Sequence, residues 1–111
     1  MNISCEEYDQ VVVVNIDGEL SADTAEVFKN TAQESLQEQH FFFVVNFEKV
    51  SLIDSEGLEA LLWLKDQVQE GEGQVKLAAL DETSAKILTM TRLDHRFDIH
   101  PQVIQAVKCF S

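Results

Sequence analysis

Residues 41–58 read FFFVVNFEKVSLIDSEGL. The first part, residues 41–47, is apolar at nearly every position, which is typical of a strand covered on both faces of a sheet. Residues 48–53 look like a loop. Asp54 and Ser55 follow, and both have short side chains that accept hydrogen bonds from the free N–H groups of a helix's first turn. The segment therefore predicts a buried strand, a connecting loop and a helix that opens near a serine hydroxyl.

The helix after this junction is predicted from apolar residues that recur on one side of it. These residues are Leu58, Leu61, Leu62 and Val68, with Leu64 at the margin. Trp63 falls on the far side, where its ring either contacts a partner or lies flat over neighbouring side chains. Gly57, in the first turn, would leave the serine hydroxyl unshielded and allow another protein to approach closely. A helix stop follows at residues 70–73, Glu-Gly-Glu-Gly.

Two roles are open for Asp54 and Ser55. In the first role, the two residues only cap the helix. In the second, Ser55 is a regulatory phosphate acceptor, because a helix N-terminus stabilises added negative charge and the same charge repels an acidic partner surface. Neither role requires catalysis by this chain, so we expect that it is not an enzyme.

The rest of the chain alternates strands and helices, apart from an N-terminal edge strand that pairs antiparallel with its neighbour. The predicted elements are strands over residues 2–6 and 11–16, a loop over 17–21 with Gly18 at positive φ, a helix from Ser21 or Asp23 to about Gln39, a strand over 74–80, a helix over 82–92 capped by Asp81, a strand over 97–99, and a final helix from His100-Pro101. The apolar residues of the last two helices are Ala85, Ile87, Leu88 and Met90, then Val103, Ile104, Val107 and Phe110.

This order predicts an α/β fold. The sheet has four or five strands, is mainly parallel with an antiparallel N-terminal edge strand, and is accompanied by about four helices. At 111 residues the chain is long enough for one domain, which we expect to span residues 1–111.

The net charge of -12 limits the partners. It disfavours binding to DNA, RNA or anionic lipid, which would repel the chain, and it suits a partner with a neutral or basic face. The N-terminus lacks the features of a signal peptide, and no apolar run reaches the roughly 18 residues that cross a bilayer. We therefore expect a cytoplasmic protein without a membrane segment.

The sequence predicts that the protein binds no metal, no cofactor and no small-molecule substrate. Cys5 and Cys109 lack CxxC spacing and are expected to be buried or half-buried free thiols. His40, His95 and His100 are scattered along the chain, which favours loop and cap roles over metal ligation. The phosphate-loop pattern GxxxxGK[ST] and the nucleophile pattern GxSxG are both missing from the sequence.

Two segments resemble the STAS-domain anti-sigma-factor antagonists of bacteria. They are Asp17-Gly18-Glu19-Leu20, ahead of the first predicted helix, and residues 45–58, VNFEKVSLIDSEGL, ahead of the second. The resemblance implies partner switching: the unphosphorylated antagonist binds an anti-sigma factor, often a serine kinase, and so frees a sigma factor for transcription. Phosphorylation of Ser55 by that kinase would inactivate the antagonist, and a separate serine phosphatase would restore it.

The resemblance also implies roles for single residues. Those that support the acceptor loop are Asn46, Asp54, Glu56 and Gly57. Those that bind the partner are Gly18, Glu19, Ser21, Asp23, Ser55, Glu56, Leu58, Glu59 and Trp63.

Two positions depart from the family's pattern, and they leave a second function open. The family often has Asp-Ser-Ser-Gly, where this chain has Glu56 in place of the second serine, and it often has Asp where this chain has Ser21. The alternative function is a non-switching STAS scaffold subunit of a signalling or transporter complex. A phosphate-receiving aspartate domain fits less well, because Asp17 and Glu19 make a poor acidic pair.

Overall fold

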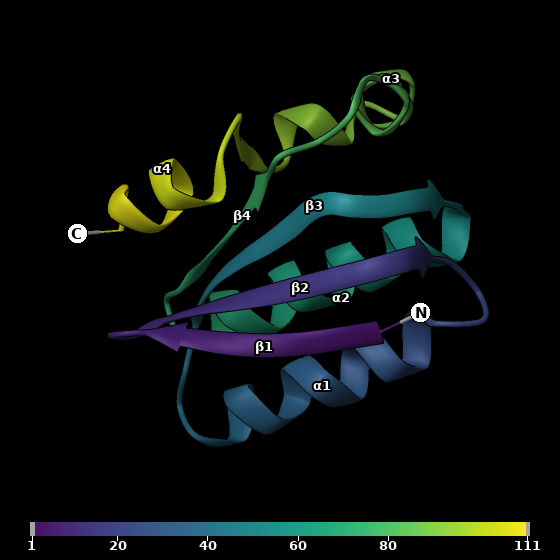
Figure 1. Ribbon diagram of the computed structural model, residues 1–111. Helices are drawn as coiled ribbons and strands as arrows, with labels where there is room; N and C mark the ends of the chain where they lie inside the picture. Colours follow the sequence, from purple (N-terminus) through teal and green to yellow (C-terminus); the bar gives the residue numbers. More distant parts are fainter. Residues whose placement is uncertain (1, 111) are drawn as a thin grey trace.

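Five strands form one sheet in the order β1-β2-β3-β4-β5 in the computed structural model, which describes residues 2–110 (Figure 1). The strands are β1 (Asn2–Tyr8), β2 (Val11–Leu20), β3 (Phe42–Ile53), β4 (Gln74–Ala78) and β5 (Asp98–His100). The helices are α1 (Ala25–Gln37), α2 (Ser55–Glu70), α3 (Glu82–Met90) and α4 (Val103–Lys108), with a short 3-10 turn, η1 (Leu93–His95). Only the β1–β2 pair is antiparallel, so the predicted fold class is confirmed.

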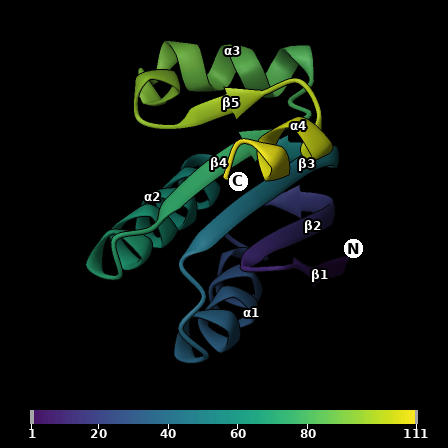
Figure 2. The same ribbon diagram turned by 90° about the vertical axis from the view of Figure 1, so that its left-hand side faces the viewer.

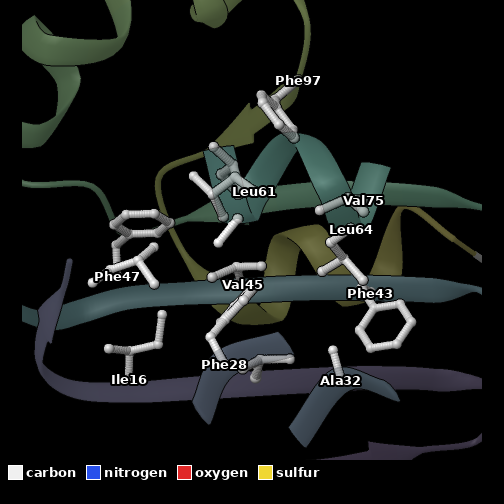
Figure 3. Close-up of a cluster of buried hydrophobic side chains, with 14 of the residues drawn as sticks. Ile16, Phe28, Ala32, Phe43, Val45, Phe47, Leu61, Leu64, Val75 and Phe97 are labelled. Carbon is white, nitrogen blue, oxygen red and sulfur yellow. The ribbon is translucent and has the colours of Figure 1, made fainter. Parts of the chain in front are cut away.

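Helices cover both faces of the sheet, as Figure 2 shows from the side. On one face, alternate residues of the central strands pack with Phe28 of α1 and Leu61 of α2 in the main core (Figure 3). On the other face, a smaller cluster joins Val13 and Val44 to Ala106 of α4. Because residues 11–14 are buried on both sides, the central strands are apolar at successive positions, as predicted.

β2 and β3 both continue through segments that the sequence suggested were loops, residues 17–21 and 48–53. Parallel pairing carries on to Leu20 and Ile53, with register shifts on either side of residues 17–18. Gly18 has φ 120°, as expected for a glycine, but it lies within β2 rather than in a loop. The extension takes β3 well beyond its last pair with β4, at Asn46, and this sets the place where α2 begins.

Neither Ser21 nor Asp23 caps α1, contrary to the prediction. The N-cap residue is Thr24, whose hydroxyl accepts a hydrogen bond from the Ser21 N–H (2.9 Å) and donates one to the Glu19 carbonyl (2.8 Å). The threonine therefore closes the turn that connects β2 to α1, and Ser21 is buried inside that turn.

The C-terminal elements also differ in detail from the prediction. His100 is the last residue of β5, where its carbonyl accepts a hydrogen bond from Ala79 at 3.1 Å, so α4 begins only at Val103. Met90 of α3 and Ile104 of α4, both predicted to pack inward, are 82% and 59% exposed. Leu88 and Ala106 are the buried anchors of these two short helices.

Candidate functional site

The junction between β3 and α2 is held by the side chain of Asp54. As predicted, Asp54 is the N-cap of α2: one carboxylate oxygen accepts a hydrogen bond from the Gly57 N–H at 2.9 Å. The other oxygen accepts from the Ala22 N–H at 3.1 Å, in the connection between β2 and α1. A single carboxylate therefore ties two loops together, and the exposed residue Ser55 follows it as the first residue of α2.

The hydrogen bonds also keep Asp54 charged. The Gly57 N–H, and then the Ala22 N–H, lower the pKa of the Asp54 carboxyl below its ordinary value, because both bonds favour the ionised form. A negative charge is thus fixed directly beside Ser55, and Glu56 adds a second exposed carboxylate to the same turn.

Gly57 allows α2 to pack closely against β2, whereas the sequence analysis expected it to leave the Ser55 hydroxyl unshielded. The prediction is therefore corrected. The residue is buried, and a Cβ built on it would lie 2.0 Å from the carbonyl oxygen of Leu20. Any side chain at this position would push α2 away from the end of β2. The glycine therefore allows the helix to begin at the strand end and so determines where Ser55 lies.

The end of β2 lies beside this junction, as the sequence resemblance implied. Gly18 pairs with Val50 and Glu19 with Leu52 in the extended part of the β2–β3 ladder. The Asp54 N–H donates to the Leu20 carbonyl at 3.3 Å. The predicted docking loop and the predicted acceptor loop are therefore adjacent strand ends.

The predicted partner-binding residues divide into exposed and buried ones. Asp23, Glu56 and Glu59 are exposed around Ser55. Ser21 and Leu58 are only 4% and 8% exposed, so their side chains pack inside the domain and do not reach its surface, which corrects their assignment.

Trp63 is half-buried and packs against the main core. The Lys29 ammonium of α1 lies 6.0 Å from its ring centroid, so the ring spans the contact between α1 and α2. Of the two roles considered for this ring, the geometry supports packing over neighbouring side chains. Leu64, placed at the margin of the apolar side, is instead fully buried.

Asn46 is not part of the acceptor loop. Its side-chain amide donates to Asn15 at 2.8 Å, and its oxygen accepts from the Glu48 N–H at 3.0 Å. Asn15 in turn donates to Glu6 at 2.6 Å. These residues line a polar surface cavity of about 320 Å³ over the central part of β1, β2 and β3, whereas Ser55 follows the end of β3.

Leu52 is a candidate site residue that the sequence analysis did not single out. It is 49% exposed near the end of β3, three positions before Ser55, whereas Val50 and Ile53 on either side of it are buried. The only signal in the sequence was an apolar residue in a segment taken for a loop. An exposed apolar side chain close in sequence to Ser55 is a candidate contact surface for another protein.

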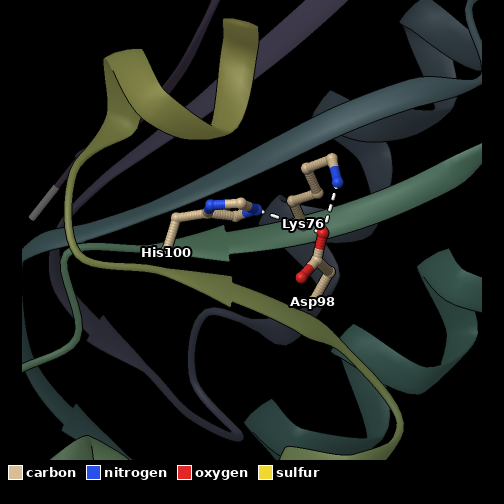
Figure 4. Close-up of polar contacts among 3 residues, drawn as sticks. All are labelled: Lys76, Asp98 and His100. Atoms are coloured by element: carbon tan, nitrogen blue, oxygen red, sulfur yellow. Dashed lines mark hydrogen bonds and ion pairs between the residues drawn. The ribbon is translucent and has the colours of Figure 1, made fainter. Parts of the chain in front are cut away.

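A separate ionic cluster lies under α4, away from Ser55. Lys76 of β4, almost fully buried, donates to the Asp98 carboxylate of β5, and His100 lies 3.1 Å from the same carboxylate oxygen (Figure 4). The hydrogen bond from Lys76 is the main reason that the pKa of the Asp98 carboxyl is lowered. The Phe110 ring lies 4.8 Å from the ammonium, so the cluster fastens the C-terminal segment to the sheet.

Within residues 2–110, no helix is both long enough and apolar enough to span a bilayer.

Known proteins resemble this chain over nearly its whole length. The model of the STAS domain family matches residues 2–106. The structure of an anti-sigma factor antagonist from Mycobacterium paratuberculosis has a TM-score of 0.87 at 21% identity, covering 97% of this chain and 92% of that one. The Bacillus cell fate determinant SpoIIAA in its phosphorylated form has a TM-score of 0.79 at 19% identity, covering 99% of this chain and 100% of that one.

A third similar structure is of a different kind. It is a sulfate transporter family protein from Wolinella succinogenes, with a TM-score of 0.79 at 15% identity, covering 91% of this chain and 84% of that one. At such identities these structures show the shared fold, and the family match extends over nearly the whole sequence. The chain belongs to the STAS domain family.

Proposed function

We propose that the protein is an anti-sigma-factor antagonist that works by partner switching. In its unphosphorylated form it binds an anti-sigma factor that is also a serine kinase, and phosphorylation of Ser55 ends the association until a serine phosphatase removes the phosphate. The observation that carries this proposal is the exposed Ser55 at the start of α2, directly after a carboxylate that fixes both neighbouring loops. We infer that it acts in the bacterial cytoplasm and that it regulates transcription.

The site suits a kinase substrate because a kinase supplies everything except the acceptor. The Ser55 oxygen forms a bond to the γ-phosphorus of ATP, the bond from that phosphorus to ADP breaks, and the hydroxyl proton passes to the kinase's base. The substrate therefore needs only an accessible hydroxyl in a defined position. Ser55 is exposed, and the carboxylate of the preceding Asp54 accepts hydrogen bonds from the Gly57 N–H after it and from the Ala22 N–H of the neighbouring connection.

The phosphate would act as a local electrostatic change. It adds about -1.5 to -2 charges at neutral pH, next to the carboxylates of Asp54 and Glu56. A partner that packs over Leu52 and the start of α2 would have to desolvate this crowded negative charge. Association is therefore weakened without refolding, since the helix N-terminus itself tolerates the phosphate.

A phosphorylation experiment tests the assignment. After incubation with a kinase that binds the protein and ATP, mass spectrometry should find phosphate on Ser55, and Ser55→Ala should abolish labelling. Thr83→Ala is the matched control, because Thr83 is also an exposed hydroxyl in the first turn of an Asp-capped helix, α3. A kinase that binds normally yet labels a different residue would overturn the role of Ser55.

The second candidate is a STAS scaffold subunit that stays bound to its complex. The likeness to a sulfate transporter family protein and the permanent charge of Glu56 beside the acceptor favour this candidate. It predicts that partner affinity is the same for wild type, Ser55→Ala and Ser55→Asp, whereas switching predicts that only Ser55→Asp weakens binding.

A further inference from the structure

Three possible metal ligands from two distant parts of the chain meet at one place. They are Glu7 in β1, Glu38 at the C-cap of α1, and His40 in the connection from α1 to β3. One ligand atom from each residue lies within 4.8 Å of the other two. In Figure 1 the C-terminal ends of β1 and α1 lie at the same end of the sheet, on the left of the view. No local pattern predicts this grouping, because Glu7 lies far from Glu38 and His40 along the chain.

The backbone after α1 fixes the position of the histidine. Gln39 has φ 69° and donates to the Leu36 carbonyl at 3.0 Å, which ends the helix. The His40 N–H then donates to the Ser35 carbonyl at 3.1 Å, so the residue is held close to the last turn. Its side chain is 22% exposed and its Nε2 atom lies 3.2 Å from a Glu7 carboxylate oxygen.

The charges around this point favour a cation. Glu34 and Glu38 lie at the C-terminal end of α1, where the helix dipole is negative and carboxylates are unfavourable. The last turn of the helix contains no basic residue to offset them. Glu7 adds a third carboxylate from the neighbouring strand.

The geometry points to a binding site for a divalent transition ion of the Zn²⁺ type, formed by Glu7, Glu38 and His40. A tetrahedral zinc ion with bonds of about 2.0–2.1 Å holds its ligand atoms about 3.4 Å apart, close to the separation already present between His40 and Glu7. Rotation of the exposed Glu7 and Glu38 side chains would bring the third ligand into range. Two carboxylates neutralise the ion, and its fourth position stays open to water.

The site is separate from Ser55. Glu7 pairs with Val12, which in turn pairs with Phe43 near the start of β3, whereas Ser55 follows the end of that strand. A bound ion would tie β1 to the end of α1, at the end of the sheet opposite Ser55. Metal binding and partner binding can therefore be measured independently.

Isothermal titration of the whole protein with ZnCl₂ tests this site. We expect one Zn²⁺ per chain for wild type, and affinity reduced about tenfold or more by His40→Gln and by Glu7→Gln. His95→Gln is the matched control, because His95 is 83% exposed beside Asp94 and should bind no ion at this site. Equal affinities in all four proteins, or no binding by wild type, would overturn the site.

A second measurement needs no variant and so does not depend on how the variants fold. In NMR spectra of the wild-type histidine rings, one equivalent of Zn²⁺ should shift the signals of His40 and leave those of His95 in place. Shifts of both rings to the same extent would mean non-specific binding and would contradict the proposal.

Discussion

The Asp54 carboxylate accepts a hydrogen bond from the Ala22 N–H at 3.1 Å across 32 positions of sequence. Its second oxygen holds the Gly57 N–H at 2.9 Å. The side chain therefore fixes the start of α2 against the connection that follows β2. This double contact gives Ser55 a defined position on the surface although its own side chain is exposed.

Because of this carboxylate, the stability of the fold should decrease at acidic pH. Hydrogen bonds from Gly57 and then Ala22 lower the pKa of this carboxyl in the folded state. The ionised carboxylate therefore stabilises the fold fully above pH 3.8, the pKa in the unfolded chain. This stabilisation is lost as the pH falls through the lower pKa of the folded state. Asp54→Asn keeps a capping oxygen but does not titrate. Between pH 7 and pH 3 the thermal midpoint of wild type should fall a few degrees further than that of Asp54→Asn. Parallel curves would contradict this role.

Gly57→Ala should destabilise the fold by about 1–3 kcal/mol, the usual cost of overpacking. The added Cβ would lie 2.0 Å from the Leu20 carbonyl oxygen, and this neighbour is backbone that cannot rotate away. Urea denaturation measures the loss. Glu59→Ala, at an exposed position of the same helix, is the control and should leave the free energy of unfolding within about 0.5 kcal/mol of wild type. An unchanged Gly57→Ala protein would mean that the contact is looser than described.

The strongest local signals in the sequence predicted the structure well. Apolar residues at successive positions of 11–14 and at nearly every position of 41–47 predicted the two central strands, and Asp54 and Gly71 marked the two ends of α2. These features depend on neighbours in the sequence, such as capping oxygens and β-branched side chains, so they can be read without the fold.

The features that were missed depend on contacts distant in sequence. Residues 48–53 are polar enough to look like a loop, and only their pairing with residues 17–20 makes them a strand. Ser21 is buried because Thr24 closes a turn over it, and Gly57 is required because Leu20 lies against it. None of these relationships leaves a periodic pattern in the sequence.

Asp98→Ala should lower the free energy of unfolding by roughly 1–3 kcal/mol, because it leaves a buried ammonium without its partner. The Lys76 side chain is 5% exposed, and Asp98 is the carboxylate that it contacts. Glu82→Ala is the control: it removes the partner of Lys86 in a 3.8 Å ion pair that is largely exposed, and should cost less than about 0.5 kcal/mol. The Lys76→Met, Asp98→Ala double variant should recover part of the loss. Equal losses for Asp98→Ala and Glu82→Ala in urea denaturation would contradict a structural role for the cluster.

The two cysteines should differ in reactivity. Burial is the main cause that raises the pKa of the Cys5 thiol to about 11, whereas Cys109, contrary to expectation, is exposed. Compared with an ordinary thiol of pKa 9.0, Cys5 has roughly a hundredfold smaller thiolate fraction near neutral pH. With a disulfide reagent at pH 8, the Cys109→Ser variant, which keeps only Cys5, should react slowly. The Cys5→Ser variant, which keeps only Cys109, should react fast. A fast reaction in Cys109→Ser would show that the Cys5 thiol is not shielded.

The most direct test of the switch is the affinity of the isolated anti-sigma partner for three proteins: wild type, Ser55→Asp and Thr83→Asp. The two variants add the same charge to the first turn of an Asp-capped helix, at α2 and at α3. We predict that Ser55→Asp weakens binding on the order of 5- to 150-fold, that Thr83→Asp binds like wild type, and that both keep a thermal midpoint near that of wild type. Equal affinities for all three proteins would contradict the proposal that charge at Ser55 controls the partner.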